Sequence, residues 1–293
     1  MTKYWEVTKT LANSTNQQLI NEYLLSLKLA NRSQLSIENY RSKLQNFFLD
    51  IKQPIEKLTV EKVRDQLQTK YAGCRETTVA TTISFLASFF QFCQKEGYLS
   101  HDLIKNRWRP RLPKSIPKYL GKEEQARTKL VIEKLSLRDR AIVELLLASG
   151  CRVRELHTLN ISDVDLEERT AQVLGKGNEI RTVHFHDACA LVLEKYLETR
   201  IDDNPALFLS HRKRRMTVRG IQLMIQKIGE QAELKTRLTP HSLRHTFATN
   251  LLSKGADISF ISEELGHSKL DTTRIYARLP QEDVVSLYRK YMG

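Results

Sequence analysis

The chain has 293 residues, of which 41% are hydrophobic and 28% charged, a composition typical of a soluble globular protein with one or two domains. Its formal net charge of +13, spread over both halves, indicates a protein that meets polyanions, usually nucleic acid, although a basic protein without such a partner has the same composition. No apolar run approaches the roughly 18 residues of a membrane helix, and the amino terminus has no apolar signal core, so we expect a cytoplasmic protein without membrane contact. Four widely spaced cysteines without a Cys-x-x-Cys pair predict reduced thiols, and they argue against a zinc site or a disulfide framework.

The first hundred residues carry apolar side chains at helical spacing, which predicts a helical bundle. The expected helices centre on residues 19–27, 37–51, 60–67 and 83–92. Ser36 and Thr59 are candidate caps of the second and third helices. The fourth helix is apolar on two sides and ends near Gly97, so we interpret its phenylalanines as core side chains. We expect residues 1–15 to be unstructured and residues 1–104 to form one helical domain.

Residues 105–118 have the composition of a linker. Pro110, Pro113 and Pro117 prevent a continuous helix, and six basic residues stand in this segment with no acidic one. We interpret it as an extended basic linker that contacts phosphates. A linker that is merely solvated has the same sequence features.

The remaining residues combine helices with one hairpin signal. Helices are predicted over residues 123–135, 137–149, 187–200, 217–232, 240–253, 258–265 and 269–277. Two apolar runs flank Gly175-Lys176-Gly177-Asn178, a spacing typical of a β-hairpin. The glycines expose Lys176 at the expected tip, where a lysine either reaches a ligand or is only solvated.

One predicted helix carries several basic side chains close together. Thr239 can cap this helix, and Pro240 suits its first position. His241 and Arg244 are three residues apart, so their side chains meet on the helix surface, where a cation beside a titratable donor suits a phosphate. The alternative is a metal pair formed by His241 and His245. The usual zinc helix motif has a glutamate after its first histidine, which is missing here, and no third ligand is evident.

Three further residues stand where predicted helices begin or end. Arg152 follows a helix stop at Gly150 and lies at the start of the next helix. His267 follows a second stop at Gly266, and Tyr276 lies near the far end of the short helix predicted after it. His267 and Tyr276, taken alone, each have the ordinary interpretation of a structural side chain.

Taken together, these segments resemble the tyrosine recombinases, the phage integrase family. That family combines an arginine after a Thr-Gly-Leu-like turn, a lysine on a β-hairpin, His-x-Leu-Arg-His, Leu-Gly-His and a terminal tyrosine. The matching residues occur here in the same order: Arg152, Lys176, His241, Arg244, His267 and Tyr276. The chain departs from the pattern at Cys151, where leucine is usual, and at Arg154, where serine is common. Neither change removes a catalytic group.

The resemblance implies a mainly α fold with a small antiparallel sheet. It also implies a helical core-binding domain, the linker, and an α+β catalytic domain over residues 119–293, which together form a C-shaped clamp on DNA. The tail after Tyr288 lacks the His-Pro ending common in Xer proteins. This difference favours integration, excision or resolution of a mobile element over Xer-type resolution of chromosome or plasmid dimers.

The resemblance further implies a role for each residue in strand cleavage. Arg152 and Arg244 would hold the non-bridging oxygens of the scissile phosphate and stabilise the charge of the transition state. Tyr276 would attack the phosphorus atom and remain attached to the 3′ phosphate, while His241 assists proton movement.

The remaining roles concern the leaving group and the placement of the phosphate. Lys176 would protonate the departing 5′ oxygen, His267 would donate a hydrogen bond to the phosphate, and Glu155 would orient its neighbours. Because the covalent intermediate conserves the energy of the phosphodiester, we expect neither a cofactor nor a metal ion.

The expected partners are double-stranded DNA recombination sites, bound by a homo-tetramer on two sites, with or without accessory proteins. The final segment, residues 282–291, is predicted to form a short amphipathic helix that docks on a neighbouring protomer. Rival functions are a type IB topoisomerase, a DNA-binding protein with a decayed active site, and a metal-dependent nuclease. The decayed protein is disfavoured because every expected catalytic residue is present, and the nuclease because no acidic metal cluster is evident.

Overall fold

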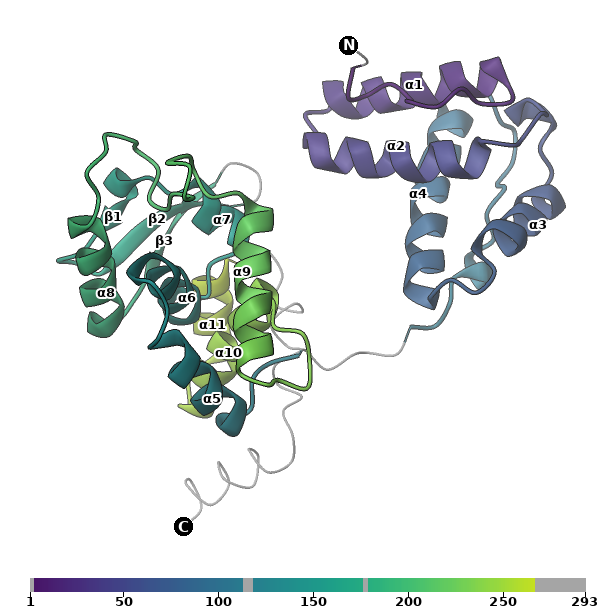
Figure 1. Ribbon diagram of the computed structural model, residues 1–293. Helices are drawn as coiled ribbons and strands as arrows, with labels where there is room; N and C mark the ends of the chain where they lie inside the picture. Colours follow the sequence, from purple (N-terminus) through teal and green to yellow (C-terminus); the bar gives the residue numbers. More distant parts are fainter. Residues whose placement is uncertain (1–2, 113–117, 176–178, 267–293) are drawn as a thin grey trace. The chain divides into compact units, whose positions relative to one another are not determined.

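The computed structural model describes residues 3–112, 118–175 and 179–266 (Figure 1). The chain divides into two compact units, Met1–Lys114 and Ser115–Gly293. The described part is mainly helical and contains a small antiparallel sheet, as the resemblance implied. None of its helices combines the length and the apolar character that crossing a membrane requires.

The helices of the N-terminal unit lie where the apolar spacing predicted them. They are α1 (Ser14–Leu29), α2 (Gln34–Phe48), α3 (Val60–Tyr71) and α4 (Glu76–Lys95), with 3-10 turns at Ile55–Lys57 and Asn106–Trp108. Thr59 caps α3 as predicted, because its hydroxyl accepts the N–H of Lys62 at 3.2 Å. The predicted cap of α2 at Ser36 is wrong. The helix begins earlier, and the hydroxyl of Ser33 accepts the N–H of Ser36.

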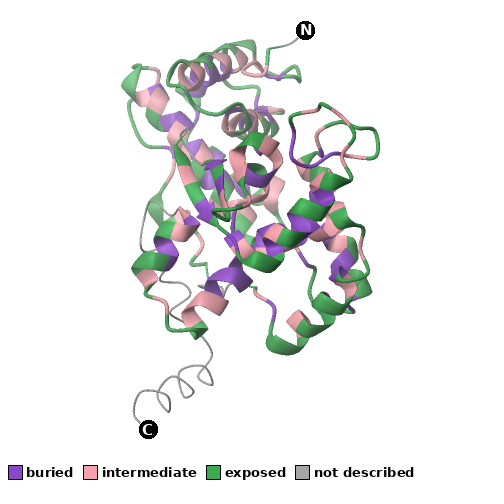
Figure 2. Cartoon of the chain, turned by 90° about the vertical axis from the view of Figure 1, so that its left-hand side faces the viewer, coloured by how far each residue is buried: buried purple, intermediate pink, exposed green. Residues whose placement is uncertain are grey.

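The aromatic side chains of α4 form the core of this unit. Phe89 and Phe90 are buried, and the ring centroid of Phe89 lies 5.6 Å from that of Phe48 on α2. Buried and exposed stretches alternate along the helices, as the purple and green segments in Figure 2 show. The interpretation of these phenylalanines as core side chains is therefore confirmed.

The segment before α1 packs against the same core, so the prediction that residues 1–15 are unstructured is wrong for residues 3–15. Val7 and Leu11 are buried with the apolar side chains of the bundle. The N–H of Ala12 donates to the carbonyl of Leu49 at 3.1 Å. Two buried apolar residues are too few to give a periodic signal, and the hydrogen bond joins positions far apart in the sequence.

The C-terminal unit packs its helices against one face of a small sheet. Its elements are α5 (Lys122–Ile132), α6 (Leu137–Ser149), α7 (Val153–Thr158), a 3-10 turn (Ile161–Asp163), β1 (Val164–Asp165), β2 (Thr170–Leu174), β3 (Ile180–His184), α8 (Asp187–Glu198), α9 (Val218–Gln231), α10 (Pro240–Ser253) and α11 (Ile258–Leu265). In this unit α6 packs against both α8 and α10. The helix predicted over residues 269–277 lies outside the described residues.

The predicted hairpin is confirmed as the antiparallel pair β2–β3, in which Gln172 lies opposite Thr182. The structure adds the short strand β1 at the other edge of β2, giving the order β1-β2-β3. Val173 and Val183 are buried on the inner face of the hairpin. The sheet therefore presents one face to the core of the unit.

The helix α10 differs from the amphipathic helix that the sequence indicated. Thr239 caps it and Pro240 opens it, as predicted. Arg244 and His245, expected at the surface with His241, are instead buried, because α6 and α11 both pack against α10. Only His241 of these three is exposed.

Candidate active site

The turn after α6 places the first arginine of the site. Gly150 ends α6 in the left-handed conformation, with a φ of +59°, and its N–H donates to the carbonyl of Leu146. A Cβ at this position would lie 2.3 Å from the ring of Phe247 on α10. The chain then passes through the buried Cys151, and Arg152 becomes the N-cap of α7. The prediction that Arg152 lies at the mouth of a helix is confirmed.

Arg152 is held by the carboxylate of Glu155. Its backbone N–H donates to Oε2 of Glu155 at 2.7 Å, and its Nη1 donates to Oε1 at 2.6 Å. Its Nη2 donates to the carbonyl of Gly266 at 3.1 Å. The Arg152 side chain is 37% exposed, so it remains accessible to a ligand.

Glu155 is the buried anion of the site, with only 2% of its side chain exposed. Burial by itself raises the pKa of this carboxyl group. The hydrogen bond from the Arg152 amide and the charges of Arg181 and Arg152 outweigh burial, so the pKa of Glu155 lies below its usual value. The group is therefore ionised at neutral pH and acts as a fixed negative charge.

Arg244 reaches the same place from α10, with 3% of the residue exposed. Its Nη1 donates to the carbonyl of Gly150 at 2.6 Å, and its Nη2 donates to the carbonyl of Leu265 at 2.5 Å. The guanidinium therefore joins the end of α6 to the end of α11. Arg244 and Arg152 donate to the carbonyls of adjacent residues, Leu265 and Gly266, which brings the two predicted catalytic arginines together.

His241 stands at the exposed start of α10, beside these cations. Its ring lies edge-on to the ring of His245, with centroids 4.2 Å apart. Partial removal from water and the nearby charges of Arg244 and Arg152 lower the pKa of His241 below its ordinary value of 6.5. The imidazole is therefore mainly neutral at pH 7 and able to accept a proton.

Arg181 on β3 is a member of this cluster that no sequence motif singles out. Its Nη2 donates to Oε2 of Glu155 at 2.9 Å, and its Nη1 donates to the carbonyl of Glu264 at 2.5 Å. One signal could have found it. Arg181 lies two residues before the buried Val183, so alternation along the strand turns this arginine toward the core rather than toward solvent.

The carboxyl end of α11 thus receives three guanidinium groups. Arg181, Arg244 and Arg152 donate in turn to the carbonyls of Glu264, Leu265 and Gly266. The last carbonyls of a helix lack partners within it and carry partial negative charge, so cations are favoured there. The cluster holds three guanidiniums and one carboxylate, that of Glu155, so it carries net positive charge at the end of α11, which His267 follows in the sequence.

Three predicted site residues lie outside the described residues: Lys176, His267 and Tyr276. The described chain reaches the immediate neighbours of two of them. β2 ends at Leu174 and β3 begins at Ile180, and the connection between these strands contains Lys176 in the sequence. Gly266 ends α11 with a φ of +60°, as the predicted helix stop requires, and His267 follows it in the sequence.

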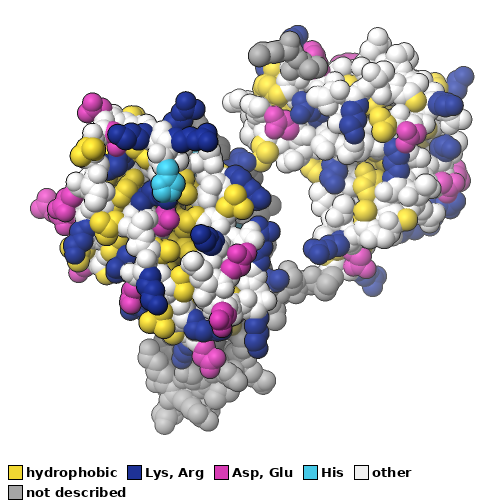
Figure 3. Space-filling view, in the orientation of Figure 1, with side chains coloured by type: hydrophobic (Ala, Val, Ile, Leu, Met, Phe, Trp, Pro, Cys, Tyr) yellow, Lys and Arg dark blue, Asp and Glu magenta, His cyan; other side chains and the backbone are white. Residues whose placement is uncertain are grey.

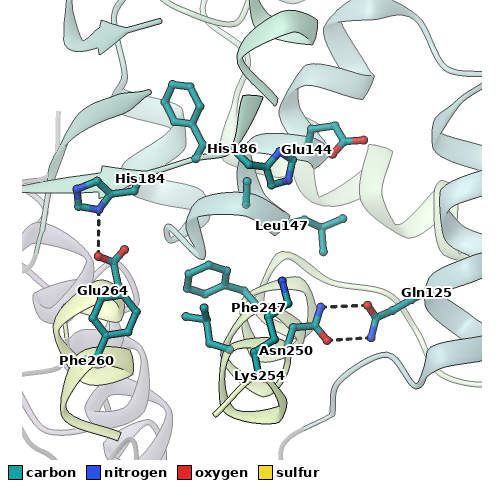
Figure 4. Close-up of a pocket in the computed structure, with 13 residues that line it drawn as sticks. Gln125, Glu144, Leu147, His184, His186, Phe247, Asn250, Lys254, Phe260 and Glu264 are labelled. Atoms are coloured by element: carbon teal, nitrogen blue, oxygen red, sulfur yellow. Dashed lines mark hydrogen bonds and ion pairs between the residues drawn. The ribbon is translucent and has the colours of Figure 1, made fainter. Parts of the chain in front are cut away.

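A pocket of about 670 Å³ lies beside the arginine cluster, between β3, α6, α10 and α11. Figure 4 shows His184 pointing toward Glu264, with the Nδ1 of His184 3.0 Å from Oε1 of Glu264. At the far side, Gln125 and Asn250 exchange two side-chain hydrogen bonds of 3.2 and 3.0 Å. The apolar part of the lining is formed by Leu147, Ala148, Phe185, Phe247, Leu251 and Phe260.

Basic side chains occur over much of the surface seen in Figure 3, and one basic cluster is partly turned inward. Lys and Arg side chains are spread over the visible faces of both units, interspersed with acidic ones (Figure 3). Within residues 3–112, 118–175 and 179–266, no three His, Cys, Asp or Glu side chains come together as a metal site would require. Residues 211–215 form a cluster of basic residues in the sequence. One of them, Arg215, turns inward and donates to the carbonyls of His157 and Leu159.

Sequence comparison relates both parts of the chain to one group of proteins. Residues 119–282 match the phage integrase family, and residues 20–97 match the N-terminal SAM-like domain of phage integrases. The chain is 33% identical to the tyrosine recombinase XerC of Oceanobacillus iheyensis, over 92% of this chain and 93% of that protein. It is also 33% identical to the tyrosine recombinase XerA of Pyrococcus horikoshii, over 90% of each chain.

Solved structures agree with this relationship at the level of the fold. The XerH recombinase bound to its difH substrate matches with a TM-score of 0.74 and 22% identity, over 99% of this chain and 90% of XerH. A lambda integrase dimer bound to a core site matches with a TM-score of 0.73 and 19% identity, over 88% of this chain and 94% of that chain. From the family match and the full-length relatives, we conclude that this chain belongs to the phage integrase family and is a tyrosine recombinase, an enzyme of site-specific DNA recombination.

Proposed function

We propose that this enzyme cleaves and rejoins double-stranded DNA through a transient 3′-phosphotyrosyl bond to Tyr276. The observation that carries the proposal is the meeting of Arg152 and Arg244 on the adjacent carbonyls of Leu265 and Gly266. Two guanidiniums from distant parts of the sequence thereby meet at Leu265 and Gly266, the residues that precede His267 in the sequence. A planar pair of this kind matches the non-bridging oxygens of a phosphodiester.

The arginines supply what attack on a phosphodiester needs. The phosphate is already negative, and the pentacovalent transition state carries further charge. Arg152 can contact the phosphate from its partly exposed position, and Arg244 acts from within the protein, where water screens its charge less. In this proposal His267 donates a hydrogen bond to the same phosphate.

The nucleophile needs a proton acceptor. A tyrosine with a pKa of about 10 is only roughly 0.1% ionised at pH 7, which corresponds to about 4 kcal/mol of activation free energy. The lowered pKa of His241 keeps its imidazole neutral, so it can take the proton of Tyr276 as the phosphorus–oxygen bond forms. Lys176 then protonates the departing 5′ oxygen. A 5′ hydroxyl from a second strand reverses these steps and restores the free tyrosine.

The test is a covalent-adduct assay on a nicked duplex. A binding site is first selected with the purified protein from random-sequence duplexes, and a nick is placed beside the cleavage position so that the released fragment diffuses away. The parent protein should form a denaturation-resistant protein–DNA adduct, with or without a chelator. Tyr276→Phe should bind the duplex and form no adduct, whereas Tyr98→Phe, in the N-terminal unit, should match the parent. Adduct formation by Tyr276→Phe would refute the assignment.

We further propose that the two units clamp DNA from two sides and that four protomers act on two sites in the cytoplasm. The solved lambda integrase tetramer on a Holliday junction, at 19% identity and a TM-score of 0.71, supports the assembly by analogy of fold. We propose that the tail, residues 282–291, docks on a neighbouring protomer. The pocket of Figure 4 suits its apolar side chains, and the carboxylates of Glu144 and Glu264 suit the basic Arg289 and Lys290.

The biological role has two candidates, each favoured by one observation. Full-length similarity to XerC and XerA favours resolution of chromosome or plasmid dimers. The match of residues 119–282 to the phage integrase family favours integration, excision or resolution of a mobile element. Sequencing the DNA that flanks the gene decides between them. A pair of inverted repeats and an excised circle would identify a mobile element, and their absence together with recombination at a chromosomal site would identify the Xer-type role.

A further inference from the structure

We propose that Arg181 is a positioning residue of the recombinase. It offsets the negative charge of Glu155, so that Glu155 does not neutralise Arg152 and the Arg152 guanidinium remains available to the DNA phosphate. The inference rests on the proposed function, because it assigns Arg181 a role through Arg152. Arg181 does not itself contact the reacting atoms in this proposal. It lies on β3 and acts through its bonds to the carboxylate of Glu155 and to the carboxyl end of α11.

The contacts of Arg181 tie three segments together. Its Nη2 donates to Glu155 near the start of α7, and its Nη1 donates to the carbonyl of Glu264 in the last turn of α11. Its side chain also lies flat against Gly266, because a Cβ there would stand 2.7 Å from both Cδ and Nε of Arg181. A planar group with two separate acceptors and a glycine against its face is fixed in position.

The charges show why the site needs this third arginine. Glu155 is buried and bonds to Arg152 through Oε1 and through the backbone N–H. If Glu155 faced Arg152 alone, the two charges would cancel, and the carboxylate would compete with a phosphate for the guanidinium. Arg181 bonds to Oε2 at 2.9 Å, so the three groups together carry one net positive charge.

The same arginine also holds the turn that leads to His267. The carbonyls of Glu264, Leu265 and Gly266 each accept from a different guanidinium. Without Arg181, the carbonyl of Glu264 loses this donor and the end of α11 loses its backbone anchor to β3, while the side-chain contact between His184 and Glu264 remains. A displacement of about 1 Å among groups that hold a reacting phosphate can cost on the order of 100-fold in rate.

The competing explanation is that Arg181 only stabilises the fold. A buried ion pair broken on one side destabilises a protein whatever the protein does. The two explanations differ in a double substitution. If Arg181 offsets Glu155, removing the Glu155 charge relieves the loss of Arg181. If Arg181 serves the fold alone, both variants change only the stability, and the rate of adduct formation per folded molecule stays parental.

The experiment measures the single-turnover rate of adduct formation on the nicked duplex, together with the Kd for the intact duplex. Arg181→Gln should bind DNA within about threefold of the parent and form adduct roughly 10- to 100-fold more slowly. Arg181→Gln with Glu155→Gln should be faster than Arg181→Gln alone. Arg169→Gln is the control, because Arg169 likewise forms an ion pair beside this sheet, with Asp187, but that pair is exposed and involves none of the clustered arginines; this variant should cleave at the parental rate.

Three results overturn the inference. These are a parental rate for Arg181→Gln, a double variant no faster than Arg181→Gln, and a loss of DNA binding that accounts for the whole rate loss. If Arg181→Gln does not fold, Arg181→Lys decides. It keeps the charge but cannot reach both acceptors, so it should bind DNA normally and lose less than about tenfold in rate. Inactivity of Arg181→Lys with normal binding overturns the inference. A parent protein that forms no adduct refutes the proposed function itself, and the inference falls with it.

Discussion

Gly150→Ala is the substitution whose cost the structure defines most directly. Alanine would have to adopt the left-handed conformation at a φ of +59°, which costs roughly 1–2 kcal/mol. Its Cβ would also stand 2.3 Å from the ring of Phe247, which is packed between α6 and α11 and must move. Overpacking of this kind costs typically about 1–3 kcal/mol. We therefore expect Gly150→Ala to lower the free energy of unfolding of the C-terminal unit by about 2–5 kcal/mol.

The assay must report on the C-terminal unit. The unfolding of the two units can be followed by different signals. Both tryptophans, Trp5 and Trp108, lie in the N-terminal unit, so their fluorescence follows that unit. Amide hydrogen exchange of peptides from α6 and α10, measured by mass spectrometry, follows the other. Gly97→Ala is the control. Gly97 has a φ of +82° with no atom within 4 Å of an added Cβ, so only the conformational cost applies, in the N-terminal unit.

The structure also predicts a functional effect of this substitution. The carbonyl of Gly150 accepts from Nη1 of Arg244 at 2.6 Å, so movement of the turn displaces the guanidinium that we propose holds the DNA phosphate. Adduct formation by Gly150→Ala should therefore fall even where the protein is fully folded. Exchange in α6 and α10 equal to that of the parent, together with a parental cleavage rate, would refute both the packing and the role given to this turn.

Three further predictions concern protonation, thiols and assembly. The pKa of His241 is lowered, so protonation is disfavoured in the folded state, and folding stability should hold above pH 6.5 and decline as the pH falls below it. Adduct formation should decline once the pH falls below the lowered pKa of His241, and a cleavage rate that stays constant down to the pH at which the protein unfolds would contradict the role of His241. Iodoacetamide should label the exposed Cys74 in the native protein and spare Cys151, because burial raises the pKa of the Cys151 thiol to about 11; equal labelling would show that the turn after α6 is open. Deleting residues 281–293 should abolish recombination between two sites and leave binding to one site intact, and unchanged recombination would exclude the proposed docking of the tail.

The sequence predicted most helices of this protein because their ends carry local signals. Thr59 and Thr239 cap helices through their own hydroxyl groups, and Gly150 and Gly266 stop helices by adopting positive φ. Signals of this kind need only neighbouring residues. The segment before α1 had no such signal, because its order depends on Val7 and the other buried side chains that meet the bundle from a distance.

The motifs named candidate site residues, but the way the described part of the site is built could not be predicted from them. The motifs identify Arg152 and Arg244, yet nothing in them indicates that both arginines bind the end of α11. The role of Arg181 depends on the register of β3 and on contacts with Glu155 and Glu264, which are distant in the sequence. The burial of Arg244 was likewise decided by the helices that pack against α10 rather than by the spacing of residues along α10.

The assignment of Tyr276 as the nucleophile is tested by identifying the amino acid that becomes attached to DNA. The parent protein is incubated with the nicked duplex in the presence of a chelator, the adduct is digested with trypsin and nuclease, and the modified peptide is sequenced by mass spectrometry. We expect a nucleotide joined through its 3′ phosphate to the phenolic oxygen of Tyr276. Attachment to another residue, linkage through a 5′ phosphate, or cleavage without any covalent adduct would contradict it.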